Sequence, residues 1–514
     1  MRFRLAACVL IAAGALAACR TAPPAPDRFI TVALQNSPTN LDPGVGLDEA
    51  SQRIHQLLFS SLMKISDDLT IVPDLAVRFE TIDSQTYTVG IPPGVRFHDG
   101  REMTSADVVY TFRRFLDKSF VSARKGAYTD LVAVDPVDRY TTTFRLRSPS
   151  ATFSSNLTFI GIVPEGSGAS TARTPIGSGP YRLTEFVPDD HVTLTAFDGY
   201  YRGAPKNSGF VFKIVPDETM RGLELRKGDV DLVVNDFGPD MVYTLQQMPQ
   251  LKVVEGPGTD YAYIGLNLRD AILKDRRVRQ AIGYAIDRQA IVQYLQRGQA
   301  RLTPGMIPSM SWAYADDVFR FTHDIAKAKA LLDEAGYPDP DGDGPAMRLH
   351  LTLKTSTSER YRVQAAALQQ QLRQAGIDIE VRSSEFATMF SDVIRGNVQL
   401  YTLVFTGGSV ADPDILRRVF HSTQTPPNGF NRARYSNPDV DALLDRATAA
   451  LDPVDRRNAY VAAQRIIAAD APMLSLWART NVAVAQSDLT GVTLSPVGDF
   501  DFLRGVARVG AAPR

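Results

Sequence analysis

Two short segments contain residue types that could do chemistry, a serine motif and an acidic motif. The segment "GGSVA" (407–411) follows an apolar run and precedes a helical pattern, as the nucleophile elbow Gly-x-Ser-x-Gly does. Its last position is Ala411, however, and His421 follows too closely for the usual order of serine, acid and histidine. The near-motif therefore lacks its context, and we expect no catalytic residue and no enzyme.

The acidic motif "DPDGDG" (339–344) places aspartates at the first, third and fifth positions of a calcium-binding loop. His350 stands at the twelfth position, where such a loop needs a bidentate glutamate. A solvated turn between a helix and a strand is the simpler interpretation. Histidines are scattered singly and no Cys/His cluster has zinc spacing, so we expect neither a bound metal nor a cofactor.

Cys19 is a candidate for lipid attachment. A basic start, Met1 to Arg4, is followed by an uncharged run, Leu5 to Ala18, that is too short for a membrane span. The segment "LAAC" (16–19) resembles the bacterial lipobox, in which the peptide is cut before a lipidated cysteine. The proline-rich stretch after it suits a stiff tether. The alternative is an ordinary signal peptide in which Cys19 is incidental.

Composition limits the class of protein. A chain of 514 residues predicts two or three domains. Its 56 basic and 57 acidic residues give a net charge of −1, which gives no support for nucleic-acid binding. The only cysteines are Cys8 and Cys19, so no disulfide is expected after export, and a chain of this length can bury a sufficient core without one.

Helical and strand patterns alternate along the chain. Residues 28–36 predict a first strand, and 87–91 and 95–97 predict two strands joined by a proline turn. Thr104 and Asp107 have the spacing of a capping box at a helix start. Between 358 and 405, helix, strand, helix and strand follow one another, which favours α/β lobes with parallel strand pairs. The apolar segments 258–268 and 474–486 are candidate crossings between two lobes that open and close.

The ordered set of motifs resembles the bacterial extracellular solute-binding proteins of family 5, the peptide-, dipeptide- and nickel-type binding components of ABC importers. The segments that carry the resemblance span the chain after Cys19 in family order: "LDP" (41–43), "VPDLAVRFE" (72–80), "GVRFHDGREMTSADVVYTF" (94–112), "GSGPYRL" (177–183), "AFDGYYRGAPK" (196–206), "RKGDVDLV" (226–233), "YIGLNL" (263–268), "DRRVRQAIGYAIDRQAIV" (275–292), "DIAKAKALLDEAGYPDPDGDG" (324–344) and "NRARYSNPDVDALL" (431–444).

The resemblance implies an α/β fold like that of periplasmic binding proteins. This fold is a two-lobe clamshell with an extra small domain inserted in lobe I, mixed sheets flanked by helices, and two hinge crossings. We expect a lipoprotein signal peptide at 1–18 and a tether at 19–27. The expected domains are lobe I (28–48, 174–262 and 483–514), the inserted small domain (49–173) and lobe II (263–482).

Three regions line the ligand cleft in this family, and the resemblance implies candidate ligand-binding residues in each. They are Gly46, Leu47 and Asp48 after "LDP"; Tyr261, Tyr263 and Trp477 at the crossings; and Phe405, Gly408, Ser409 and Asp412 after the strand "LYTLVF". For each tyrosine, packing at the hinge is an alternative to ligand contact.

The third region departs from the pattern of peptide-binding relatives, which place an aspartate there that pairs with the peptide's α-ammonium. This chain has Gly407, Gly408 and Ser409, and the nearest carboxylate is Asp412. Asp412 also fits the cap of a helix with Pro413 at its first position, so capping and ammonium binding are alternatives. A buried ammonium without a carboxylate is costly, which admits solutes other than free peptides.

The resemblance implies a binding protein that captures a peptide or peptide-like solute and delivers it to an ABC permease and its ATPase. It also implies an exported monomer, held by a lipid anchor in the periplasm or at the cell surface. Two alternatives stay open: a non-peptide solute such as a metal chelate, an opine or a saccharide, or a sensor that hands its ligand to a receptor.

Overall fold

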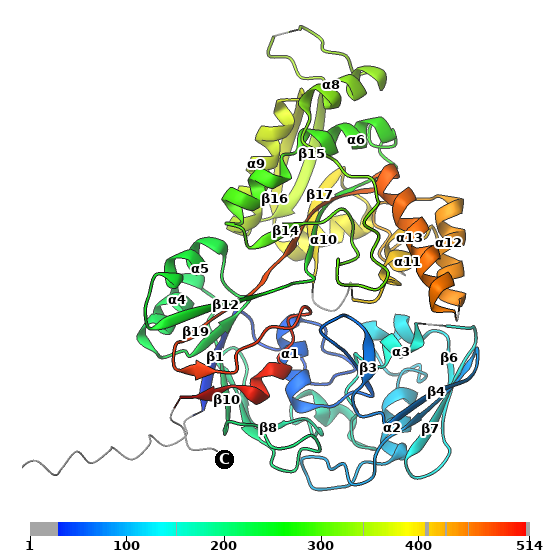
Figure 1. Ribbon diagram of the computed structural model, residues 1–514, viewed down its shortest axis with the longest axis vertical. Helices are drawn as coiled ribbons and strands as arrows, with labels where there is room; N and C mark the ends of the chain where they lie inside the picture. The colour runs from blue at the N-terminus through cyan, green and yellow to red at the C-terminus, as the bar shows by residue number, and fades with distance from the viewer. Residues whose placement is uncertain are drawn as a thin grey trace, which may run out of the picture.

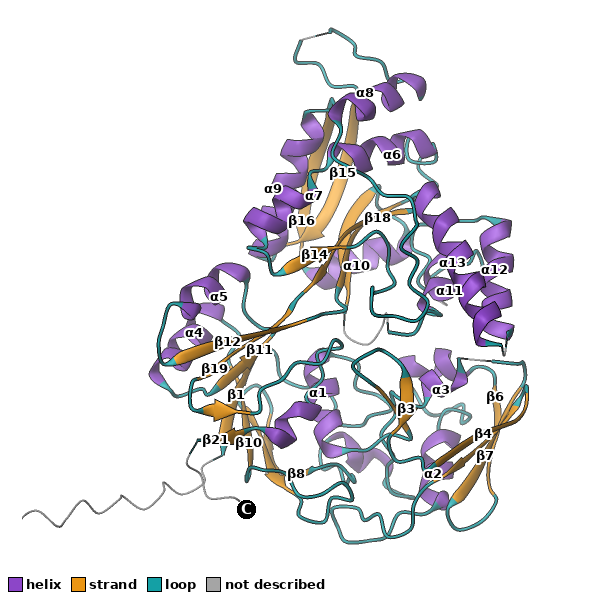
Figure 2. Ribbon diagram, in the orientation of Figure 1, coloured by secondary structure: helices purple, strands orange, loops and turns teal. Residues whose placement is uncertain are grey.

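The computed structural model describes residues 29–150, 152–342, 344–406, 411–426, 429–450 and 452–509. They form two lobes and a smaller domain, each built around its own sheet (Figure 1). Lobe I and the small domain lie side by side in the lower half of the molecule, and lobe II lies above both (Figure 2). The α/β two-lobe architecture expected from the sequence is confirmed.

Lobe I is built on a mixed seven-stranded sheet. Its strand order is β12 (Leu251–Gly256), β19 (Asn481–Gln486), β11 (Leu232–Val234), β1 (Ile30–Leu34), β10 (Gly209–Ile214), β9 (His191–Ala196) and β8 (Tyr181–Val187). The helices of this lobe are α1 (Glu49–Leu58), α4 (Glu218–Lys227) and α5 (Pro239–Gln246), and the hairpin β20 (Leu489–Thr490) and β21 (Ala507–Arg508) flanks the 3-10 turn η5 (Asp501–Gly505). Helix α4 ends at Gly228, whose φ of 80° is the left-handed conformation that glycine accepts at a helix end.

The small domain surrounds an antiparallel four-stranded sheet. Its order is β4 (Arg78–Asp83), β5 (Thr86–Gly90), β7 (Thr141–Leu146) and β6 (Leu131–Pro136). The remaining elements are β2 (Met63–Ile65), β3 (Ile71–Pro73), α2 (Ser105–Arg113), α3 (Phe153–Asn156), η1 (Ala123–Tyr128) and η2 (Gly168–Ala172). The predicted capping box is confirmed at α2, where the N–H of Thr104 donates to the Asp107 carboxylate over 2.8 Å.

Lobe II is built on a mixed six-stranded sheet. The order is β14 (Ala300–Leu302), β18 (Met473–Arg479), β13 (Tyr261–Leu266), β17 (Leu400–Phe405), β15 (Leu349–Ser356) and β16 (Ile377–Ser384). Its helices are α6 (Arg276–Ala285), α7 (Arg288–Ala290), η3 (Ile291–Leu295), α8 (Ile325–Glu334), α9 (Glu359–Arg373), α10 (Phe386–Arg395), α11 (Ile415–Phe420), α12 (Pro438–Ala449) and α13 (Pro453–Asp470). As predicted, β15 pairs in parallel with β16 and β17.

The second strand predicted at 95–97 is wrong. These residues form only an isolated bridge between Arg96 and Glu102, because the chain turns back at Gly100, where φ is 89°. Val95 and Phe97 are nevertheless buried in the core of the small domain. The alternation of apolar residues at 95–97 therefore reflects burial and not strand pairing. In the described part of the chain, no helix combines the length and apolar character that a membrane crossing requires.

Two adjacent antiparallel segments join the lobes. Strand β12 continues into β13 through 257–260, and β18 continues into β19 immediately after Arg479. Gly256 pairs with Asn481 on the lobe I side, and in the crossing itself the N–H of Arg479 donates to the carbonyl of Asp260 over 2.9 Å. The pairing therefore runs from one sheet into the other, and any movement between the lobes must bend this two-stranded ribbon.

Asn481 holds the lobe I end of the ribbon. It is 5% exposed, and its amide nitrogen donates to the carbonyls of Pro257 (3.1 Å) and Ser495 (2.8 Å). Its amide oxygen accepts a 3.1 Å hydrogen bond from Asn235. One side chain thus joins the two crossing segments, the end of β11 and the C-terminal region.

We expect Asn481→Ala to lower the free energy of unfolding by about 3 kcal/mol, because it leaves buried carbonyls and the Asn235 amide without their partner. Urea unfolding followed by circular dichroism measures the change. The control is Asn458→Ala, an exposed site on α13 where the change should stay within about 0.5 kcal/mol. Equal effects at the two sites would contradict the role given to Asn481.

Candidate functional site

The two halves of the molecule touch near the crossings. Arg297 of lobe II forms an ion pair with Asp240 on α5 of lobe I, and its guanidinium lies 4.6 Å from the centroid of the Tyr243 ring. Arg360, at the start of α9, donates to the carbonyl of Phe237 over 3.3 Å. These contacts bring lobe II against lobe I beside the ribbon.

A second contact joins lobe II to the small domain. The hydroxyl of Ser155 on α3 donates to the carboxylate of Asp412, which precedes α11. Arg456 on α13 lies 3.8 Å from the same carboxylate. Burial raises the pKa of Asp412, and the positive charge of Arg456 opposes that rise. A carboxylate predicted to face a ligand therefore lies in the contact between two domains.

A cavity of about 250 Å³ opens beside this contact. The small domain contributes one wall and lobe II the other, and the lining residues are Phe79, Thr81, Tyr87 and Ser154 on the first side and Trp312, Pro453 and Arg456 on the second. Because its walls come from two bodies, the cavity exists only while lobe II rests on the small domain.

The predicted first region, Gly46 to Asp48, leads into α1 of lobe I. Asp48 caps this helix by accepting from the N–H of Ser51 over 2.8 Å, and it also accepts from Thr39. Burial disfavours the ionised form, but these hydrogen bonds outweigh it and lower the pKa of Asp48. A Cβ at Gly46 would lie 2.2 Å from the carbonyl of Asn40, so only glycine fits there, whereas the Leu47 side chain is 43% exposed.

The predicted aromatic residues of the crossings pack on one another. The ring of Tyr263 stacks at 5.8 Å on Tyr261 and at 5.3 Å on Phe405, and all three residues are buried. The hydroxyl of Tyr261 forms a 2.6 Å hydrogen bond with Ser475. Trp477 is 1% exposed and belongs to the hydrophobic core of lobe II. The structure thus brings the two tyrosines and Phe405 together and places Trp477 apart from them.

The third region is described only in part. Gly408 and Ser409 lie outside the described residues. The prediction that Asp412 caps a helix beginning at Pro413 is wrong, because α11 begins at Ile415 and Asp414 stands at its N-cap. Asp412 instead accepts the N–H of Asp414 over 2.8 Å, which forms a turn before the helix.

Two arginines beside Phe405 were not predicted from the sequence. The guanidinium of Arg432 lies 5.2 Å from the Phe405 ring centroid, and its NH1 group donates to the hydroxyl of Tyr263 over 2.9 Å. Arg418 and Arg432 both lie on the ring of Phe430. The segment "NGFNRARY" (428–435) gave no signal for this cluster, because its partners come from β13, β17 and α10.

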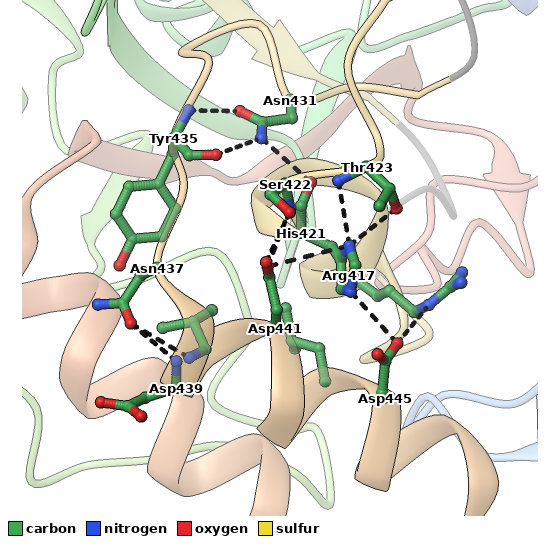
Figure 3. Close-up of polar contacts among 12 residues, drawn as sticks. Arg417, His421, Ser422, Thr423, Asn431, Tyr435, Asn437, Asp439, Asp441 and Asp445 are labelled. Carbon is green, nitrogen blue, oxygen red and sulfur yellow. Dashed lines mark hydrogen bonds and ion pairs between the residues drawn. The ribbon is translucent and has the colours of Figure 1, made fainter.

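A buried asparagine holds this segment in place (Figure 3). Asn431 is 0% exposed, donates to the carbonyls of His421 and Tyr435, and accepts from the N–H of Tyr435. Figure 3 also shows Asp441 accepting from the N–H and the hydroxyl of Ser422. These bonds fix the backbone on either side of Phe430 and Arg432.

The same view shows that the neighbouring serine, Ser422, is not hydrogen-bonded to His421. The Ser422 hydroxyl donates to Asp441 over 2.6 Å and not to His421. His421 accepts from the N–H of Thr423 and lies 3.3 Å from a carboxylate oxygen of Asp445. No group of three or more histidine, cysteine, aspartate or glutamate side chains in the described ranges is placed to hold a metal ion.

Comparison with known proteins identifies the family. Residues 70–427 match the model of the bacterial extracellular solute-binding proteins, family 5. The chain belongs to this family. The family 5 protein is similar over most of its length to the oligopeptide-binding protein AppA of Bacillus subtilis, at 29% identity over 90% of this chain and 88% of that protein.

Further relatives are also similar over nearly the whole of both chains. The glutathione-binding protein GsiB of Pectobacterium atrosepticum is 29% identical over 96% of the family 5 chain and 97% of its own. The solved structure of Bacillus subtilis AppA with a nonapeptide has a TM-score of 0.80 at 27% identity, covering 94% of this chain and 99% of that one. The substrate-binding protein CtaP of Listeria monocytogenes has a TM-score of 0.84 at 25% identity, covering 94% and 99%.

His55, which packs against the first candidate region, makes the folding stability depend on pH. Its Nε2 bonds to the carbonyl of Asn40 over 3.0 Å, and its ring packs against Gly46. Burial lowers the pKa of His55 to about 4, and the bond to Asn40 offsets this only in part. Because the unfolded chain takes up this proton near pH 6.5, folding stability is complete above that pH and is lost as the pH falls towards 4.

We therefore expect the free energy of unfolding of this family 5 protein to fall by up to about 3 kcal/mol through His55 between pH 7 and pH 4. His55→Gln keeps a hydrogen-bond donor without a titrating group, so its urea-unfolding profile should be flatter over this range. His350→Gln, at a side chain that is 74% exposed, should keep the wild-type slope. A His55→Gln profile as steep as the wild type would refute the assignment.

Proposed function

We propose that this chain is the substrate-binding component of an ABC importer, and that it captures a peptide or peptide-like solute between lobe I and lobe II. The observation that carries the proposal is the two-lobe arrangement, in which one ribbon joins the lobes. Lobe II contacts lobe I through Arg297 and Asp240, and it contacts the small domain through Asp412 and Ser155. The full-length similarity to peptide-binding and glutathione-binding relatives supports the class of solute.

The proposed mechanism is a shift between open and closed arrangements. Arg297, Arg360 and Asp412 make contacts that exist only when the halves meet, so these contacts stabilise the closed form alone. A solute that touches both lobes adds to them and shifts the population towards closure. The permease and its ATPase then take the unaltered solute from the closed form.

The proposed solute site lies between the predicted regions. From lobe I it takes Gly46, Leu47 and Asp48, and from lobe II it takes Phe405, Gly408, Ser409 and Asp412. We assign Tyr261, Tyr263 and Trp477 to the packing that supports this wall, since all three are buried. The proposed domains are lobe I (28–48, 174–262 and 483–514), the small domain (49–173) and lobe II (263–482), except that α1 (Glu49–Leu58) packs in the core of lobe I and moves the start of the small domain beyond it.

Removing a contact between the lobes should weaken closure on the solute. Arg297→Ala removes both the ion pair with Asp240 and the contact with Tyr243, so the affinity for solute should fall about threefold to tenfold. Isothermal titration with a defined pool of tripeptides to nonapeptides measures the affinity. The control is Arg382→Ala on β16, whose guanidinium pairs with Glu380 at the lobe II surface.

Small-angle scattering on the same samples measures the radius of gyration, and so it separates a change in lobe closure from a change in solute affinity alone. Wild-type protein should contract when the peptide pool is added, and Arg297→Ala should contract at higher peptide concentration. An Arg297→Ala variant with unchanged affinity and unchanged contraction would remove this contact from the mechanism.

We also propose that the protein is an exported monomer anchored by a lipid on Cys19, in the periplasm or at the cell surface. The lipobox-like sequence supports this, and Cys19 itself lies outside the described residues. Cys19→Ser should move the protein from the membrane fraction to the soluble fraction of a bacterial host. Retention of the Cys19→Ser chain in the membrane fraction would contradict the anchor.

A further inference from the structure

Two arginines of lobe II share one aromatic ring. The guanidinium carbons of Arg418 and Arg432 lie 4.4 and 5.4 Å from the centroid of Phe430. Arg432 also lies 5.2 Å from Phe405 and 5.1 Å from Phe390, so phenyl rings surround it on three sides. Aromatic faces attract a guanidinium, but they do not neutralise its charge.

This aromatic-arginine cluster lies towards the other half of the molecule. Phe405 is the last residue of β17, and Phe390 stacks at 5.6 Å on Phe386 of α10, a side chain that is 51% exposed. Figure 1 shows α10 low in lobe II, on the side that faces lobe I. Arg418 is itself exposed. The cluster is therefore within reach of a solute held between the lobes.

Neither arginine has a carboxylate partner within the ranges that the structure describes. Arg432 donates through NH1 to Tyr263, while its buried Nε has no hydrogen-bond acceptor there. Asp412 and Asp414 act on Arg418 through space, but no ion pair joins them to it. Arg53, Arg348 and Arg508 also have an unpartnered Nε, but each of them pairs with two carboxylates. Within the same described ranges, Arg124, Arg221 and Arg434 share the lack of an ion pair, and Arg432 differs from them in lying among three phenyl rings.

The side of Arg432 that carries the unpartnered Nε has a definite chemistry. Nε and NH2 form the side of the guanidinium that can bind a carboxylate through two parallel hydrogen bonds. A buried donor without an acceptor is costly, and two guanidinium groups on one ring repel each other. An anion at this point would accept a hydrogen bond from the unpaired donor and would offset the repulsion between the two guanidinium groups.

We propose that Arg418 and Arg432 bind an anionic group of the captured solute, a carboxylate in a peptide-like solute. This inference rests on the proposed function and deepens it by naming the class of solute. The sequence "GGSVA" (407–411) has no carboxylate where peptide-binding relatives place an aspartate for the peptide ammonium. The two arginines therefore favour an anionic group of the solute at this cluster. Acidic solutes and peptides with a blocked N-terminus are therefore ligands.

The test compares four forms of one tripeptide, trialanine with free ends, N-acetylated, C-amidated and blocked at both ends. Isothermal titration of the full chain should show that N-acetylation changes the affinity by less than threefold. C-amidation should weaken it about tenfold to a hundredfold, as loss of a charge-assisted hydrogen-bond pair does. Arg432→Gln and Arg418→Gln should weaken binding of the free carboxylate forms and leave the amidated forms unchanged.

Two variants control for folding and for charge. Arg432→Lys keeps the positive charge and should recover part of the lost affinity, and its thermal unfolding reports whether the cluster still packs. Arg382→Gln on β16 removes an exposed guanidinium of the same lobe and should behave as wild type.

A separate arm uses glutarate and inorganic phosphate, each followed by thermal shift. Glutarate should stabilise wild-type protein and neither glutamine variant, while stabilisation by phosphate alone would overturn the choice of a carboxylate. Tripeptides that bind with no preference for a free carboxylate would overturn this inference and leave the proposed function intact. Glutarate binding without any tripeptide binding would overturn the peptide-like function and leave the anion site intact, and binding of neither would overturn both.

Discussion

Two antiparallel segments pass from the seven-stranded sheet into the six-stranded sheet, and their pairing determines where the lobes can move. One ladder ends at Gly256 and Asn481, the other begins at Tyr261 and Ala478, and the hydrogen bond from Arg479 to Asp260 lies between them. The ribbon can therefore bend between the two ladders while the sheets at its ends stay intact. Asn481 fixes the lobe I end, and the stacked Tyr261, Tyr263 and Phe405 fix the lobe II end. The residues between the lobes are therefore carried on two rigid walls, and the functional proposals depend on this arrangement.

Local sequence patterns predicted much of this architecture. Thr104 and Asp107 start a helix, and the alternation between 358 and 405 gives parallel pairs, because both features depend on neighbouring residues. The pattern at 95–97 failed because burial in a turn and burial in a strand give the same alternation. Asp412 failed because the turn before α11 delays the helix.

The candidate site was harder to predict because its parts are far apart in the chain. The resemblance to family 5 supplied the regions, and the structure shows how differently their residues are used: Leu47 is exposed and Trp477 is buried. Arg418 and Arg432 could not be found from spacing, since the rings around them come from α10, β17 and the segment after α11. Charge without a counter-ion is visible only once the fold has assembled those rings.

The central claim is that two walls close on a solute by bending one ribbon. Pulsed electron–electron double resonance tests it most directly, with spin labels at Val77→Cys and Val454→Cys in a chain whose Cys8 and Cys19 are serine. The two labelled positions are exposed, one on the small domain and one on α13. We expect a broad distance distribution without solute that narrows to its shortest distances when the peptide pool is added. One unchanged distance with and without solute would contradict the account.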